Sequence, residues 1–183
     1  VADLVLDGLH GIAGDRDDVA LERARTEILK AVRFAPLLAK VAPKLTPVEA
    51  LARITFATDL TAVAGGEFII EHVTEDWAVK EPVYRQLDDI VPPHVCFGAN
   101  TSCIPIGRIG AATRRPDKVV GMHLMNPVYL KSAVEVIRSP ATSDATLATV
   151  NALFAQLKKE ALVVGDAPGS NRDSRAAGPR CSR

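Results

Sequence analysis

The stretch that decides the fold is FIIEHVTEDWAVKEPVYRQLDDIVPPHVCFGAN, residues 68–100. Its first apolar run, Phe68–Glu71, predicts a short strand, and Asp76–Ile90 has the apolar spacing of a helix. A second apolar run, Val95–Ala99, predicts another strand, which ends at the polar residues 100–102. A strand, a helix and a strand in this order form the basic unit of a sheet with parallel strands. The stretch therefore predicts an α/β fold.

The same alternation continues on both sides of this stretch. An amphipathic helix is predicted over Asp18–Phe34. A second, short helix begins at Thr46, because Thr46-Pro47-Val48-Glu49 has a capping-box pattern with Pro47 at the first helical position. Four further strands and one helix are predicted at Arg53–Phe56, Val119–His123, Ala133–Ile137, Ala161–Val164 and Thr142–Lys158. We expect a largely parallel sheet with flanking helices.

Composition excludes several classes of protein. The 183 residues are 48% hydrophobic, and 22 basic side chains balance 22 acidic ones. Balanced charge and few aromatic residues argue against nucleic-acid binding. No apolar run approaches the roughly 18 residues of a membrane span, and the start has no secretion pattern, so we expect a cytoplasmic protein with no membrane partner. Three cysteines without C-x-x-C spacing predict reduced thiols and no metal site.

The two ends of the chain differ from its middle. Residues 1–14 hold Gly8, Gly11 and Gly14, whereas dinucleotide-binding turns have the spacing G-x-G-x-x-G. Residues 170–183 carry four arginines among Gly, Ser and Pro, and this composition predicts disorder. The expected organisation is an atypical N-terminal segment (1–14), an α/β domain (15–169) and a disordered tail (170–183).

A specific motif lies in the second half of the chain. His123 begins an H-x-x-N-P sequence, V-E-V-I follows at Val134–Ile137, and Asn100-Thr101-Ser102 precedes both. In the order and spacing of these motifs over residues 54–169, the chain resembles the 3-hydroxyacyl-CoA dehydrogenase family. The resemblance implies a Rossmann-like domain that binds NAD, in an enzyme that oxidises a 3-hydroxyacyl thioester to the 3-ketoacyl thioester.

The chemistry of this reaction fits the motif residues. Oxidation of a secondary alcohol needs a base for the hydroxyl proton, and imidazole, with a usual pKa near ~6.5, suits that task. His123 is the candidate base. The resemblance implies that Glu135 orients the imidazole and that Ser102 and Asn126 position the substrate and the nicotinamide. Asn171 stands near the place of a further active-site asparagine of the family.

The resemblance also implies a set of contacts to NAD. Asp15, which precedes the first helix, corresponds to the acidic residue that binds the adenosine ribose. The full set of implied cofactor contacts is Asp15, Glu75, Lys80, Asn100, Ser102 and Asn126.

Each of these residues has a structural alternative. Asp15, Asp17 or Asp18 can be a helix N-cap. Ser102 can belong to a turn without a ligand, and Glu75 and Lys80 can be surface charges near a helix start.

In the family, the first strand and the glycine-rich loop come before the ribose acid, which would place them ahead of Val1. The chain is therefore expected to lack both, to lack the C-terminal helical domain, and to be inactive alone. The parent protein is expected to be a homodimer that acts on an acyl-CoA or acyl-carrier-protein substrate.

Three alternatives stay open. Leu124-Met125 and residues 129–132 depart from the family pattern. The first alternative is therefore a variant of the family that acts on short hydroxyacyl groups bound to a carrier protein in polyketide precursor supply. A second alternative is a non-catalytic fragment of the same fold. A different dinucleotide-fold oxidoreductase is disfavoured, because those enzymes commonly use a lysine or cysteine in another catalytic set.

Overall fold

The computed structural model describes residues 9–38, 45–125, 128 and 131–166. Its strands are β1 (Gly11–Gly14), β2 (Ile54–Ala57), β3 (Phe68–Glu71), β4 (Cys96–Ala99), β5 (Val119–His123), β6 (Ala133–Arg138) and β7 (Glu160–Gly165). Its helices are α2 (Asp18–Leu38), α3 (Pro47–Ala52), α4 (Trp77–Ile90), α5 (Ile106–Ala111) and α6 (Asp144–Gln156), with 3-10 turns η1 (Leu60–Gly65) and η2 (Pro116–Lys118).

The strands form two sheets. Five of them lie in the order β3-β4-β5-β6-β7, and β1 pairs with β2 in a separate two-stranded sheet. All pairings are parallel except that of β5 with β6, which is antiparallel. Helices connect the parallel strands, because two parallel strands can be joined only by a crossover connection. The predicted Rossmann-like α/β fold with a largely parallel sheet is therefore confirmed.

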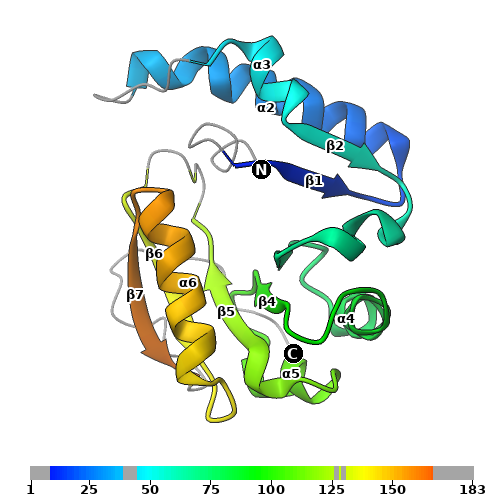
Figure 1. Ribbon diagram of the computed structural model, residues 1–183, viewed down its shortest axis with the longest axis vertical. Helices are drawn as coiled ribbons and strands as arrows, with labels where there is room; N and C mark the ends of the chain where they lie inside the picture. Colours follow the sequence, from blue (N-terminus) through cyan, green and yellow to red (C-terminus); the bar gives the residue numbers. More distant parts are fainter. Residues whose placement is uncertain (1–8, 39–44, 126–127, 129–130, 167–183) are drawn as a thin grey trace.

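Helices cover both faces of the larger sheet. Val119 and Val120 are neighbours on β5, and their side chains enter opposite core clusters because successive strand residues point to opposite faces. One cluster includes Tyr84 of α4 and Ile109 of α5, and the other includes Phe154 of α6. In Figure 1, α6 lies across the strands β5 to β7.

The smaller sheet has a core of its own. Helices α2 and α3 run along one side of β1 and β2 (Figure 1), and they bury Ile28, Val32, Ala50 and Ile54. A cleft of about 1530 Å³ lies between the two sheets and is lined by residues of β1, α2, β3 and α6. The two sheets therefore belong to two separately packed parts of the fold.

Strand β1 was not predicted. Its sequence is Gly-Ile-Ala-Gly, and glycine has a low strand propensity, so the pattern gives little signal. Tertiary pairing overrides that propensity: all four residues pair with β2, and Gly11 N donates to Arg53 O. A strand therefore lies inside the segment 1–14 that we expected to be atypical, whose residues 1–8 lie outside the described part.

All four predicted helices are confirmed, and their caps explain where they begin. Thr46 and Glu49 form the predicted capping box, with Glu49 N donating to Thr46 Oγ1 at 3.2 Å and Thr46 N donating to Glu49 Oε2 at 2.7 Å. Asp76 and Ser143 cap α4 and α6, each with a side-chain oxygen that accepts from a backbone N–H of the first turn. Helix α5 was not predicted, because glycines at positions 107 and 110 hide its pattern.

Two expectations concern the ends and the membrane. The tail predicted to be disordered, residues 170–183, lies outside the described residues. Within the described part of the chain, none of the helices combines the length and the apolar character that crossing a membrane requires.

Candidate active site

His123 and Glu135 lie opposite each other on two antiparallel strands. The register of β5 and β6 pairs His123 with Glu135, and directly opposed residues of such a pair point to the same face of the sheet. His123 Nδ1 lies 3.1 Å from Glu135 Oε2. The two side chains are 24% and 21% exposed, so the pair is reachable from solvent. The predicted hydrogen-bond contact between these side chains is confirmed.

Ser102 lies at the other side of the same imidazole. Its Oγ is 3.3 Å from His123 Nε2. A carboxylate only accepts hydrogen bonds, so in the neutral imidazole Nδ1 carries the proton toward Glu135 and Nε2 keeps its lone pair. A hydroxyl group and a basic nitrogen therefore lie side by side.

Glu75 shapes the turn that carries Ser102. One oxygen, Oε1, accepts from Ser102 N at 2.8 Å, from Cys103 N at 3.2 Å and from the Thr101 hydroxyl. Partial burial opposes ionisation of Glu75, but these hydrogen bonds and the Lys80 ammonium hold the pKa of its carboxyl below the usual range. Glu75 is thus a carboxylate that organises the turn after β4.

Lys80, on α4, is fully buried next to this turn. Its side chain is 0% exposed, and its Nζ is 2.9 Å from each oxygen of Glu71. Tyr84 OH donates to Glu71 Oε2 at 2.9 Å, and burial beside this carboxylate raises the pKa of Tyr84 well above its usual value. The alternative that Lys80 is a surface charge is therefore wrong, and its ammonium lies among protein oxygens.

Asn100 joins the ends of three strands. Its Oδ1 accepts from Leu124 N at 3.1 Å, just past β5, and its backbone N donates to Glu71 O at the end of β3. Its Nδ2 is 2.7 Å from His72 Nδ1. Burial lowers the pKa of His72, which favours the neutral ring that can accept this hydrogen bond.

Asp15 comes directly after β1 and is exposed. Its Oδ1 accepts from Asp17 N at 3.0 Å, while Asp17 Oδ1 accepts from Val19 N at 2.9 Å. The cap of α2 is therefore made by Asp17, and Asp15 presents its carboxylate at the end of the strand. Asn126 and Asn171, the two remaining candidates, lie outside the described residues.

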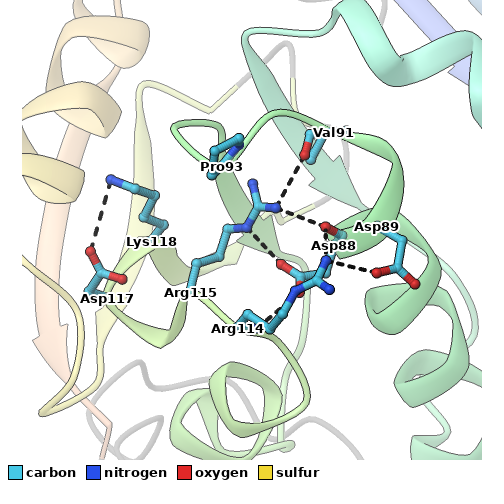
Figure 2. A pocket seen from close by; sticks show the side chains of 8 residues that line it. All are labelled: Asp88, Asp89, Val91, Pro93, Arg114, Arg115, Asp117 and Lys118. Atoms are coloured by element: carbon cyan, nitrogen blue, oxygen red, sulfur yellow. Dashed lines mark hydrogen bonds and ion pairs between the residues drawn. The ribbon is translucent and has the colours of Figure 1, made fainter.

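A second pocket, shown in Figure 2, is a structural network. Arg115 and Asp88 are nearly buried, with Nε 2.6 Å from Oδ1, and Arg115 also donates to the carbonyls of Asp88 and Val91 at the end of α4. Arg114 binds Asp88 and Asp89, and Lys118 lies 3.9 Å from Asp117. These pairs balance their charges, so the pocket offers no charge for a ligand.

Sequence reasoning missed two groups at the site. The Thr101 hydroxyl donates to Glu75, and the His72 ring contacts Asn100. Neither residue type suggests a supporting role at the site where it stands in the sequence. A weak signal was present: Thr101 and Asn100 both follow β4, where polar residues at the carboxyl end of a parallel strand often bind ligands. In the part of the chain that the structure describes, no cluster of three possible metal ligands occurs.

Residues 3–167 match the family model described as "3-hydroxyacyl-CoA dehydrogenase, NAD binding domain". A "Probable 3-hydroxybutyryl-CoA dehydrogenase" of Bacillus subtilis is 43% identical over 122 residues, which are 66% of this chain and 42% of the relative. A protein of the same description from Deinococcus radiodurans is 42% identical over 133 residues, which are 70% of this chain and 48% of the relative. The chain thus spans about half the length of these curated relatives.

Solved structures are similar as well. The crystal structure of an (S)-3-hydroxybutyryl-CoA dehydrogenase from Ralstonia eutropha superposes with a TM-score of 0.84 and 34% sequence identity. The match covers 92% of this chain and 59% of that one. Since the match includes nearly all of the present chain, the arrangement of both sheets is shared with that structure.

Proposed function

Since this chain belongs to the 3-hydroxyacyl-CoA dehydrogenase family, through the NAD-binding domain of that family, we propose that it supplies the cofactor site and general base of an enzyme that oxidises 3-hydroxyacyl thioesters. The observation that carries the proposal is the position of His123 between Ser102 and Glu135. In this arrangement the imidazole is the base, the carboxylate is the partner that orients it, and the hydroxyl group lies on the other side of the ring.

The steps assigned to the protein follow from these contacts. Nε2 of His123 takes the proton of the substrate hydroxyl group as the carbon gives up hydride. Glu135 holds Nδ1–H and stabilises the imidazolium that forms. Ser102 Oγ, which lies 3.3 Å from Nε2, can donate to the substrate oxygen and keep it beside the base. NAD, when bound, supplies the hydride acceptor.

The described residues fit NAD. Ligands of open parallel sheets bind at the carboxyl ends of the strands, and Asn100 and Glu75 follow the carboxyl ends of β4 and β3. Asp15 holds an exposed carboxylate after β1, suited to the hydroxyl groups of a ribose. We assign cofactor contacts to Asp15, Glu75, Asn100, Ser102 and, on the sequence motif, Asn126. Asn171 is assigned to the substrate on the same ground.

The substrate is proposed to be a short 3-hydroxyacyl-CoA, since the relatives are named for 3-hydroxybutyryl-CoA. Leu124 and Met125 follow His123 and depart from the family pattern, and Met125 is 42% exposed. This departure supports a second candidate substrate, a short hydroxyacyl group on a carrier protein in polyketide precursor supply. We propose a homodimeric enzyme in the cytoplasm, where the free thiols of Cys96 and Cys103 would stay reduced.

The test uses the protein at its full natural length. Oxidation of NADH is followed with acetoacetyl-CoA and, in a parallel assay, with an acetoacetyl carrier protein. We expect reduction of acetoacetyl-CoA, which reverses the proposed oxidation. A preference for the carrier protein would select the second candidate. Absence of both reactions in a folded, dimeric protein would refute the proposal and leave a non-catalytic role.

A further inference from the structure

We propose that Lys80 is a positioning residue: its buried ammonium holds the loop from Asn100 to Cys103 so that Ser102 faces His123. The inference rests on the proposed function for its catalytic meaning, and on described contacts for its geometry. The role is proposed in addition to the NAD contact that the sequence motif implies for Lys80, and it acts through protein groups.

The burial of Lys80 points to such a role. A lysine is almost never fully buried unless it is paired, because removing its charge from water is costly. Here Nζ lies 2.9 Å from both oxygens of Glu71, whose side chain is 1% exposed, and 3.3 Å from Val73 O. The ammonium is thus surrounded by protein oxygens.

Lys80 reaches the loop by two routes. The first is direct: Nζ donates to the backbone carbonyl of Asn100 at 3.0 Å. The second passes through Glu75, whose Oε2 lies 3.5 Å from Nζ. The other oxygen of Glu75 accepts from the backbone N–H groups of Ser102 and Cys103. One cation therefore fixes both the beginning and the end of the loop.

The loop in turn sets the geometry of the base. Ser102 is its central residue, and Ser102 Oγ is 3.3 Å from His123 Nε2. His123 is on β5 and Lys80 is on α4, so no local contact links them. Loss of the ammonium should release Asn100 and Glu75 together, and the hydroxyl of Ser102 would then leave the imidazole.

A purely structural role is the alternative. The pair of Lys80 and Glu71 also joins α4 to β3, and its loss could lower stability without changing the loop. Breaking one half of a buried ion pair is costly, whereas removing both charges is often tolerated. The double variant Lys80→Met with Glu71→Gln therefore separates the two roles, because it removes the unpaired charge as well as the ammonium.

The experiment compares wild type, Lys80→Met, the double variant and Arg85→Met. Arg85 pairs with Glu81 on the same helix, with 64% of the Arg85 side chain exposed, and is the matched control. Nitrogen-15 NMR of the His123 imidazole and thermal melts are recorded on each chain. The kcat and KM for a 3-ketoacyl-CoA are measured on the full-length protein.

We expect Lys80→Met to melt at a lower temperature and the double variant to recover most of that loss. In the double variant, the imidazole resonances should still shift, and kcat should fall with little change in the KM for the thioester. Arg85→Met should match wild type in every measurement. Wild-type imidazole resonances and kcat in a folded double variant would overturn the proposal. If no variant, wild type included, turns over a thioester, the proposed function fails, while the NMR comparison still decides the role of Lys80.

Discussion

Nδ1 of His123 lies 3.1 Å from Oε2 of Glu135 because the antiparallel pairing of β5 and β6 sets these two residues directly opposite each other. The contact is therefore fixed by strand register, and a shift of one residue would move one partner to the other face of the sheet. The loop bearing Ser102 comes from a different strand, β4, which pairs with β5 in parallel. The candidate base and its two partners therefore come from three neighbouring strands, β4, β5 and β6.

Replacement of His123 by alanine should remove the base and spare the fold. The side chain is 24% exposed and lies at the end of β5, so little core packing depends on it. In the full-length protein we expect kcat to fall by roughly 10²–10⁴-fold, the usual worth of a general base. Steady-state kinetics and a thermal melt check the prediction. Turnover near that of wild type in a folded variant would exclude His123 as the base.

His72 should make stability depend on pH. Partial desolvation of this otherwise exposed side chain lowers its pKa from the usual value of 6.5, with the Lys80 ammonium acting in the same direction and the carboxylates of Glu71 and Glu75 opposing it. The unfolded chain then binds the proton at a higher pH than the folded one. The stabilising contribution is complete above the unfolded pKa and is lost as pH falls through the folded pKa.

Thermal melts of wild type and His72→Gln at about pH 8 and about pH 5 test this dependence. The glutamine does not titrate, so its variant should lose less stability on acidification than wild type does. The same exchange at the exposed His94 controls for loss of an imidazole. An equal acid-induced loss in wild type and His72→Gln would contradict the prediction.

Arg115→Met should destabilise the chain strongly. It leaves the carboxylate of Asp88, which is 5% exposed, without its buried partner, and it frees carbonyls at the end of α4. We expect a loss of about 3–5 kcal/mol. The neighbouring Arg114 is 70% exposed, and Arg114→Met should cost ~1 kcal/mol or less. Urea unfolding of both variants measures the difference, and similar midpoints would show that the network in Figure 2 contributes little.

Gly121→Ala should strain the middle of the larger sheet. A Cβ atom there would lie 2.7 Å from Ile106 Cδ1 and 2.7 Å from Ile137 Cβ, both in a packed core. We expect a destabilisation of about 1–3 kcal/mol, as for other overpacked cores. Gly65→Ala is the control, because a Cβ at that position meets no atom within 4 Å. Equal stability of the two variants would mean that the sheet adjusts without cost.

The sequence predicted those parts of the fold that have local signals. Thr46 with Glu49 marked the start of α3, and the apolar run at β5 marked a buried strand. Strand β1 gave no such signal, because its two glycines carry no side chain and its stability comes from pairing with β2, about forty residues away.

The site was predicted in the same uneven way. The contact of His123 with Glu135 follows from strand order, and the sequence motif placed both residues correctly. The surroundings of Lys80 could not be read from the sequence, because lysine is usually exposed and its partners, Glu71 and Asn100, lie 9 and 20 positions away. Whether such a residue is buried depends on how a helix packs over two strand ends.

The division into two sheets has a consequence for local unfolding. In the described residues, β1 and β2 pair only with each other, and a two-stranded sheet is marginally stable without the packing of its helices. Amide hydrogens of β1 and β2 should therefore exchange with solvent faster than those of the central strands β4 and β5. Asp15 follows β1 of the smaller sheet, and Ser102 lies in the loop after β4 of the larger one. A molecule that contacts both residues would join two separately cored parts, and its binding should slow exchange in β1 and β2 more than in β5.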